Sequence, residues 1–280
     1  MVAYLANYLQ SQGFKVAVVI RGYRAQYLNS NTVVNKTFSP VLYGDEAVML
    51  ANKIDCPIII GKNRVKSVKY LLANYKLDLI ISDDGLQHYA LGRDLEIAMI
   101  DADRYFGNGH LLPLGPLRSR INELKNADFI MLNNSNFSTV HSNIDQNLDN
   151  NILQQIINKI YNIQLIANKF YNLLDHSLNK EANYFNNFNK VHAVAGIGNN
   201  QKFFNLLNSL NILTINHSFP DHYKYRPKDL DFKDNLPIIM TEKDAVKCIA
   251  FANSKFWQLK VDLQIEFEKK FQTNLLNYFK

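Results

Sequence analysis

Short apolar runs alternate with helix-forming segments along the first 132 residues, and this alternation restricts the possible folds more than any other feature. The runs are rich in Ile, Val and Leu, as strands buried on both faces are. Strands are predicted at 15–20, 57–61, 78–82, 95–100 and 128–132, and helices at 2–12, 47–54 and 64–75. The alternation predicts an α/β fold whose parallel, doubly wound sheet is flanked by helices.

A second, smaller α/β lobe is predicted for 151–280, after a first domain at 1–135 and a polar, Asn- and Ser-rich linker at 133–150. In this lobe we expect extended segments at 160–170, 191–195, 212–215 and 238–240, and a helix at 201–210. Thr241 followed by Asp244 resembles a capping box, which predicts another helix start. Gly196-Ile197-Gly198 follows a strand but lacks the third glycine of a dinucleotide fingerprint, so NAD binding is not favoured.

Two carboxylates stand where one predicted strand ends, because Asp83 and Asp84 directly follow 78–82. Ligands of open α/β sheets bind beyond the carboxyl ends of the strands. Paired carboxylates there suit Mg²⁺, which is usually held by one or two carboxylates together with substrate phosphates. The alternative is a polar turn that ends the strand. Two other residues also have two interpretations each. Asp45 is either a helix N-cap or a catalytic group. Arg118 is either a phosphate ligand or a solvated loop residue.

Composition and charge narrow the class of protein further. The chain has 280 residues, a net charge of +6 and two cysteines, Cys56 and Cys248, without metal-ligand spacing. This cysteine usage suits a reducing compartment. The basic charge is compatible with a phosphate-bearing or anionic-membrane partner, whereas no nucleic-acid motif is present. No apolar run approaches the ~18 residues of a membrane span.

Several short motifs, in their order along the chain, resemble the tetraacyldisaccharide 4′-kinase family of lipid A kinases. The matching pieces are Arg21-Gly22-Tyr23, Gly44-Asp45-Glu46, Asn63-Arg64, Asp83–His88, Arg93-Asp94, Gly107-Asn108-Gly109, Leu112–Arg118, Gly196–Asn199, Phe219–His222 and Thr241–Lys247. The resemblance implies a P-loop fold and transfer of the γ-phosphate of ATP, with Mg²⁺, to the 4′-hydroxyl of tetraacyldisaccharide 1-phosphate. It also implies work at the cytoplasmic face of the bacterial inner membrane, as a peripheral protein.

The resemblance also assigns expected roles to individual residues. Asp45 matches the base that acts on the sugar hydroxyl, and His222 matches the histidine that pairs with it. Asp83 and Asp84 match the acidic pair that handles Mg²⁺. The residues that match positions near the nucleotide or the lipid phosphate are Tyr23, Arg64, Gln87, His88 and Arg118.

The sequence departs from the family pattern in two places. The phosphate-binding string G-x-x-x-x-G-K-[ST] is absent from residues 1–280, whose one Gly-Lys pair, Gly61-Lys62, is followed by Asn63. We therefore expect the first strand, the P-loop and an upstream membrane-associating helix to be missing. Ser119 stands where the family has glutamate and supplies no negative charge.

Two other functions remain open at this stage. One is a non-catalytic nucleotide- or lipid-binding relative that kept the fold and lost the phosphate loop. The other is a soluble sugar kinase unrelated to lipid. Translation of the DNA upstream of Met1 distinguishes the binding relative from a kinase. An in-frame strand and phosphate loop there support the kinase, and a stop codon supports the binding relative.

We predict that purified 1–280 shows little or no kinase activity, because it lacks the lysine and backbone N–H groups that hold the β- and γ-phosphates. Loss of a sheet strand exposes backbone groups of its neighbours, so we also expect the chain to unfold below ~60 °C, within the usual mesophile range. Normal turnover with ATP and the lipid acceptor contradicts the first expectation. A cooperative transition well above that temperature contradicts the second.

Overall fold

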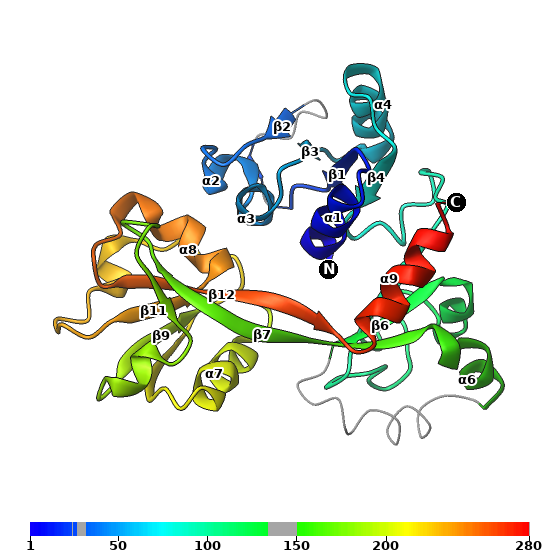
Figure 1. The fold of residues 1–280 in the computed structure, drawn as a ribbon. Coiled ribbons are helices and arrows are strands. Elements are labelled where there is room, and N and C mark those ends of the chain that lie inside the picture. The colour runs from blue at the N-terminus through cyan, green and yellow to red at the C-terminus, as the bar shows by residue number, and fades with distance from the viewer. Residues whose placement is uncertain (24, 27–31, 134–149, 280) are drawn as a thin grey trace. The chain divides into compact units, whose positions relative to one another are not determined.

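The computed structural model describes residues 1–23, 25–26, 32–133 and 150–279, and its described chain forms two compact units (Figure 1). Unit 1 consists of Met1–Asp84 and Ala167–Asp262, and unit 2 of Gly85–Ile166 and Leu263–Lys280. Each unit thus contains residues from both halves of the sequence. The division into 1–135 and 151–280 made from composition stays a prediction.

The first sheet of unit 1 has the strand order β2-β3-β1-β4. Its strands are β1 (Val16–Ile20), β2 (Thr32–Val34), β3 (Ile58–Ile60) and β4 (Leu79–Ser82). β1 pairs in parallel with β3 and β4, whereas β2 joins β3 antiparallel. Every residue of β1 and β3 is buried, as the continuous apolar runs predicted.

Four helices belong to the same part of unit 1: α1 (Val2–Ser11), α2 (Pro40–Tyr43), α3 (Asp45–Lys53) and α4 (Arg64–Asn74). α4 begins at Asn63, whose side chain accepts a hydrogen bond from the backbone N–H of Lys66 at 3.0 Å. Its apolar face packs on the sheet, where Leu71 joins a buried cluster with Ala17, Val19 and Ile59.

The second sheet of unit 1 follows the order β10-β9-β11-β12-β7. Its elements are β7 (Ile160–Asn172), β9 (Val191–Ala195), α7 (Asn200–Ser209), β10 (Thr214–Ser218), β11 (Ile238–Thr241), α8 (Glu242–Cys248) and β12 (Phe256–Ile265). β9, β10, β11 and β12 pair in parallel. Apolar clusters hold this sheet to its helices, with Phe203, Phe204 and Leu207 of α7 in one and Ala245 and Cys248 of α8 in another.

Unit 2 contains β5 (Ile97–Asp101), β6 (Phe129–Asn133) and the first residues of β7, which pair in parallel in the order β7-β6-β5. Its helices are α6 (Asn150–Ile156) and α9 (Glu268–Asn277). Phe271 of α9 is fully buried, and its ring packs on those of Phe129 and Tyr161. The remaining short elements are β8 (Asn179–Glu181) and the 3₁₀ helices η1 (Ile121–Asn126), η3 (Ile157–Lys159), η4 (Tyr184–Asn187), η5 (Pro227–Leu230) and η6 (Ile249–Phe251).

The structure confirms the α/β class and differs from the sequence prediction in its sheets. The predicted strands at 95–100 and 128–132 are β5 and β6, and they join β7 instead of extending the sheet of β1. Most of the predicted linker, 134–149, lies outside the described residues. Among the helices that the structure describes, none is both long and apolar enough to span a bilayer.

Neighbouring leucines on α4 give a direct test of its packing. Leu71 is fully buried and Leu72 is 58% exposed. We predict that Leu71→Ala lowers the free energy of unfolding by about 2–5 kcal/mol, because it leaves a cavity against the sheet. Leu72→Ala is the matched control and should change the stability by less than about 0.5 kcal/mol. Urea unfolding of both variants measures the difference, and equal losses contradict the packing described here.

Candidate active site

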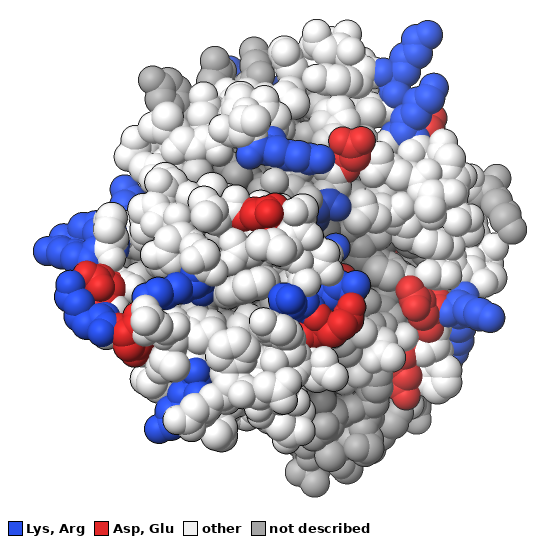
Figure 2. Space-filling model, turned by 60° about the vertical axis from the view of Figure 1, so that its left-hand side comes forward, with Lys and Arg blue, Asp and Glu red and all other residues white. Residues whose placement is uncertain are grey.

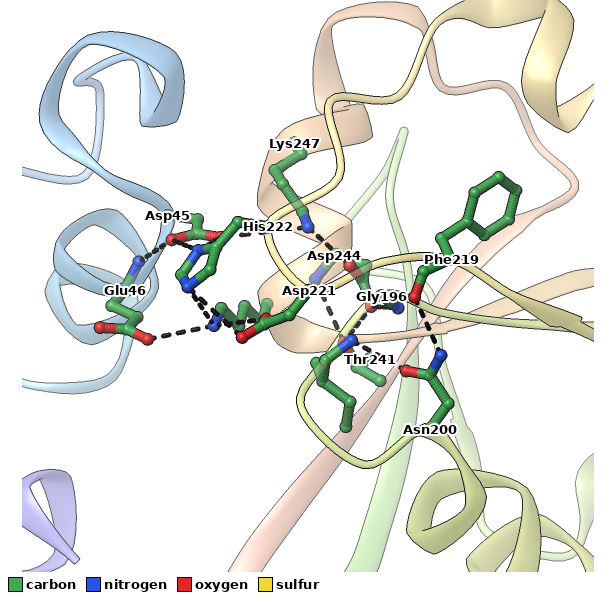
Figure 3. Close-up of polar contacts among 12 residues, drawn as sticks. Asp45, Glu46, Gly196, Asn200, Phe219, Asp221, His222, Thr241, Asp244 and Lys247 are labelled. Atoms are coloured by element: carbon green, nitrogen blue, oxygen red, sulfur yellow. Dashed lines mark hydrogen bonds and ion pairs between the residues drawn. The ribbon is translucent and has the colours of Figure 1, made fainter. Parts of the chain in front are cut away.

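A buried aspartate and a buried histidine meet in unit 1 (Figure 3). Nδ1 of His222 lies 2.9 Å from Oδ2 and 3.1 Å from Oδ1 of Asp45. The side chain of Asp45 is only 8% exposed, and that of His222 is 10% exposed. The structure therefore brings together the two residues expected to form the catalytic pair, although 177 positions separate them in the sequence.

Asp45 is held by the start of α3. Gly44, with φ of +93°, is the N-cap, so the prediction that Asp45 is the N-cap is wrong by one position. Only glycine adopts such a φ without strain. Asp45 is instead the first helical residue, and its Oδ1 accepts a hydrogen bond from the backbone N–H of Glu46 at 2.9 Å. A carboxylate at this end of a helix is favoured by the helix dipole.

Lys243, near the start of α8, contacts the other side of the imidazole. Its Nζ lies 3.3 Å from Nε2 of His222, 3.0 Å from Oε1 of Glu46 and 3.1 Å from Oδ1 of Asp221. Burial lowers the pKa of Lys243, but Glu46, Asp45 and Asp221 together outweigh burial and leave this pKa raised. Lys243 is therefore an ammonium ion at neutral pH, surrounded by carboxylates.

Asp244, also on α8, anchors this helix to β9. Its Oδ2 accepts hydrogen bonds from the backbone N–H of Gly196 at 2.9 Å and from the hydroxyl of Thr241 at 2.7 Å, and its Oδ1 lies 2.7 Å from Nζ of Lys247. Thr241 is the N-cap, as predicted, and accepts from the backbone N–H of Asp244. Burial, followed by Asp244, raises the pKa of Tyr225, whose hydroxyl leaves no room for a Cβ at position 196.

Asp83 and Asp84 follow β4 at its carboxyl end. Burial, followed by the charges of Glu46 and Asp84, raises the pKa of Asp83. Arg64 is 6% exposed and donates from Nη2 to the backbone carbonyl of Asp83 at 2.7 Å, which fixes this turn. Burial lowers the pKa of Arg64, and the charges of Asp84 and Asp83 oppose that shift.

The donor set at this turn fits a hard divalent cation. Carboxylate oxygens are the ligands that Mg²⁺ prefers, and the raised pKa of Asp83 shows that its negative charge is poorly compensated by the protein. Within the described part of the chain, no cluster of three or more His, Cys, Asp or Glu side chains is arranged to hold a metal ion. An ion bound by Asp83 and Asp84 would thus need further ligands, such as phosphate oxygens.

Tyr23 lies beside the Asp45–His222 pair. Its ring is 54% exposed, and the ring centroid lies 5.2 Å from that of His222. It therefore presents an aromatic face to solvent next to the buried pair, which is the type of surface on which sugar rings pack.

The remaining predicted residues belong to unit 2. Gln87 donates from Nε2 to Oγ of Ser119 at 3.3 Å, so the residue that departs from the family pattern contacts a predicted site residue. Arg93 supports the same turn, since it donates to the backbone carbonyl of Leu86 at 2.8 Å and pairs with Glu96. His88 is half-buried, and Arg118 lies on the loop that also carries Ser119.

The sequence reasoning missed Glu46, Asp221, Lys243 and Lys247 as parts of this site. It quoted them only within the motifs of the family resemblance. Lys243 and Glu46 are 197 positions apart, and no local pattern indicates such a contact. The sequence feature that could have identified these four residues is the concentration of charged residues next to Asp45 and His222.

Comparison with known proteins gives consistent matches. A family model described as tetraacyldisaccharide-1-P 4′-kinase matches residues 1–280. A protein of Ruthia magnifica subsp. Calyptogena magnifica, named tetraacyldisaccharide 4′-kinase, is 42% identical over 273 residues, which cover 97% of this chain and 80% of the relative. A protein of the same name from Coxiella burnetii (strain RSA 331 / Henzerling II) is 41% identical over 261 residues, covering 93% and 70%.

A solved structure supports the same fold. The crystal structure of LpxK from Aquifex aeolicus in complex with ATP superposes with a TM-score of 0.75, covering 100% of this chain and 83% of the other. The two sequences are 24% identical, so this likeness concerns the fold alone.

The raised pKa of Asp83 leads to a stability prediction. A carboxyl whose pKa is raised by folding binds its proton more tightly in the folded state, so its ionisation lowers stability as pH rises through the unfolded and then the folded pKa. We predict that Asp83→Asn raises the melting temperature of the metal-free protein at pH 7, while the exposed control Asp55→Asn leaves it unchanged.

The same two variants test the cation site. Mg²⁺ should raise the melting temperature of the unsubstituted protein and of Asp55→Asn, because a ligand of the folded state stabilises it. It should raise that of Asp83→Asn less. Thermal unfolding with and without Mg²⁺ measures both effects, and a lower melting temperature for metal-free Asp83→Asn at pH 7 contradicts the electrostatic account.

Proposed function

Because the chain belongs to the tetraacyldisaccharide-1-P 4′-kinase family, we propose that it transfers the γ-phosphate of ATP to the 4′-hydroxyl of tetraacyldisaccharide 1-phosphate in lipid A biosynthesis. The observation that carries the proposal is the buried contact between Asp45 and His222. A carboxylate hydrogen-bonded to an imidazole is suited to accept a proton from a hydroxyl group.

In this reaction Asp45 is the general base. The 4′-oxygen attacks the γ-phosphorus while its proton passes to the carboxylate of Asp45. The bond between the γ-phosphorus and the bridging oxygen breaks, and ADP leaves with that electron pair. His222 orients Asp45 by donating from Nδ1, the nitrogen that lies 2.9 Å from Oδ2. Phosphoryl transfer depends mainly on such positioning and on neutralisation of charge.

Asp83 and Asp84 would hold Mg²⁺ together with the phosphates of ATP. The ion supplies positive charge that neutralises the β- and γ-phosphates. The protein's part is to keep two carboxylates at the end of β4, where Arg64 fixes the backbone of Asp83. The poorly compensated charge of Asp83 supports this assignment.

We propose roles for five further residues. Tyr23 would pack against the sugar beside the catalytic pair, in line with its exposed ring. Arg64, Gln87, His88 and Arg118 would lie near the nucleotide or the lipid phosphate. Ser119 lacks the charge of the glutamate found in the family, and we propose that it weakens the phosphate or metal interactions of this loop.

The acceptor determines where the enzyme works. A disaccharide with four acyl chains resides in a bilayer, so we propose peripheral association with the cytoplasmic face of the inner membrane, where ATP is available. The net charge of +6 favours anionic headgroups. On the face shown in Figure 2, basic side chains are interspersed with acidic ones instead of forming one continuous patch.

A second candidate is a non-catalytic nucleotide- or lipid-binding protein of the same family. Such a protein would bind ATP or the lipid acceptor and release both unchanged.

Phosphorylation of tetraacyldisaccharide 1-phosphate in detergent micelles, with ATP and Mg²⁺, tests the proposed function. We would compare 1–280 with a protein extended by any in-frame codons upstream of Met1. In the extended protein, we predict that Asp45→Asn lowers kcat by about 100-fold or more, as expected for loss of a general base. Asp55→Asn is the matched control, since Asp55 is exposed and outside the site, and it should keep full activity.

Three outcomes separate the candidates. Product formation that requires Asp45 supports the kinase. Binding of ATP or the acceptor without product, in both proteins, supports the non-catalytic relative. Turnover of a soluble sugar without dependence on micelles or liposomes would instead indicate a kinase with a water-soluble acceptor.

A further inference from the structure

The imidazole of His222 has charged neighbours at both of its nitrogens. Nδ1 faces the carboxylate of Asp45 at 2.9 Å. Nε2 faces two groups of opposite charge, the ammonium of Lys243 at 3.3 Å and Oδ2 of Asp221 at 3.5 Å. The hydrogen bond that forms at Nε2 therefore decides which nitrogen of His222 carries a proton.

The contact with Lys243 allows only one hydrogen-bond direction. An ammonium group has three N–H donors and no lone pair, so it donates and Nε2 must accept. A nitrogen that accepts carries no proton, and a neutral imidazole then has its one N–H at Nδ1. That N–H points toward Asp45, in agreement with the short contact there.

We propose that Lys243 is a positioning residue for the Asp45–His222 pair, because its ammonium donates to Nε2 of His222 and thereby commits the imidazole's single N–H to Asp45. The catalytic consequence rests on the function proposed above. The placement of the proton on His222 does not, since it is a property of the free protein.

The surroundings keep Lys243 in place and charged. Glu46 from α3 and Asp221 from the His222 loop accept hydrogen bonds from its Nζ at 3.0 and 3.1 Å, and its side chain is only 15% exposed. These carboxylates raise its pKa despite the opposing effect of burial. The Asp221 carboxylate is thus already bonded to Lys243 through Oδ1, at a shorter distance than that between Oδ2 and Nε2.

The protonation pattern matters for the base. If Nε2 also bound a proton, a positive imidazolium would lie 2.9 Å from Asp45 and weaken it as a proton acceptor. Lys247 places its Nζ 4.0 Å from Oδ2 of Asp45, but it already pairs with Asp244 at 2.7 Å. The ring of Tyr23 contributes no charge to His222. Asp221 is therefore the group that would draw a second proton to Nε2 once Lys243 is removed.

Side-chain NMR provides the direct test. Long-range ¹H–¹⁵N correlation spectra of the free protein identify the protonated nitrogen of each imidazole, and the spectrum of His222→Asn identifies the signal of His222. We expect Nδ1–H alone in the unsubstituted protein at pH 7, and protonation of Nε2 in Lys243→Met. Lys243→Arg keeps an N–H donor and a charge, so it should retain the original pattern.

A matched control separates this effect from loss of an ion pair. Lys53 of α3 pairs with Glu242 of α8, the helix that carries Lys243, at 2.6 Å. Lys53 does not contact His222. Lys53→Met should lower stability by an amount similar to that of Lys243→Met and leave the His222 signals unchanged. Thermal unfolding of both variants checks that each one is folded under the conditions of the spectra.

Kinetics supply the second readout. Lys243→Met should lower kcat by about 10- to 100-fold with little change in KM for ATP, as expected for impaired general-base catalysis. Adding Asp221→Asn to Lys243→Met removes the carboxylate that attracts the second proton, and it should restore Nδ1–H alone and part of kcat. A merely structural role of Lys243 predicts a further loss instead.

The outcomes are distinguishable. Protonated Nε2 in the unsubstituted protein, or an unchanged His222 spectrum in Lys243→Met, overturns the proposal. So does full kcat in Lys243→Met. If neither the upstream-extended protein nor its variants phosphorylate the lipid, the proposed function fails, while the spectra still decide the role of Lys243 at His222.

Discussion

Compensation of buried charge is the constraint on which the candidate site depends. Removing an ion from water costs several kcal/mol unless an opposite charge or several hydrogen bonds replace the lost solvent. Asp45 is compensated by hydrogen bonds from His222 and from the backbone N–H of Glu46, and the fully buried Asp244 by the charge of Lys247. Breaking such a pair by removing one partner typically costs about 3–5 kcal/mol. The start of α3 is coupled to the start of α8 by a further ion pair, between Glu46 and Lys243 at 3.0 Å.

The same constraint identifies a buried charge that the protein does not compensate and that a ligand could neutralise. Burial raises the pKa of Asp83 most, and the charges of Glu46 and Asp84 raise it further. Arg64 approaches this turn through a backbone carbonyl instead of a carboxylate. The Asp45–His222 pair, proposed to be catalytic, is thus compensated from within the chain, whereas the proposed metal position depends on a cation from outside. This contrast is the physical basis for assigning proton transfer to one group of carboxylates and phosphate binding to the other.

Local signals predicted most of the elements, and long-range pairing accounts for what they missed. Val16–Ile20 and Arg64–Asn74 follow from an apolar run and from helical spacing with a capping Asn63. The long strand Phe256–Ile265 was missed, and one of its two neighbours in the sheet, β7, is distant in sequence. The N-cap of α3 was assigned to Asp45 instead of Gly44, because the φ of +93° at Gly44 is a backbone property that the sequence does not display.

The candidate site shows the same division. Asp83 and Asp84 were found from position alone, because they end an apolar strand. The pairing of Asp45 with His222 came only from resemblance to a family, since no spacing rule connects residues 177 positions apart. Lys243 was noticed as part of a helix start, and its contact with His222 appears only when α8 and the loop after β10 are placed together.

The lack of a side chain at Gly196 affects the position of His222 and so its contact with Asp45. A Cβ at this position would lie 3.2 Å from the carbonyl oxygen of Pro220 and 2.7 Å from the hydroxyl of Tyr225. Pro220 begins the short turn that ends in His222, a residue held at a φ of +61°. The turn can approach β9 this closely only because residue 196 has no side chain. The absence of a Cβ at Gly196 thus fixes the distance between the second sheet and this turn, and with it how far the imidazole of His222 can reach toward Asp45.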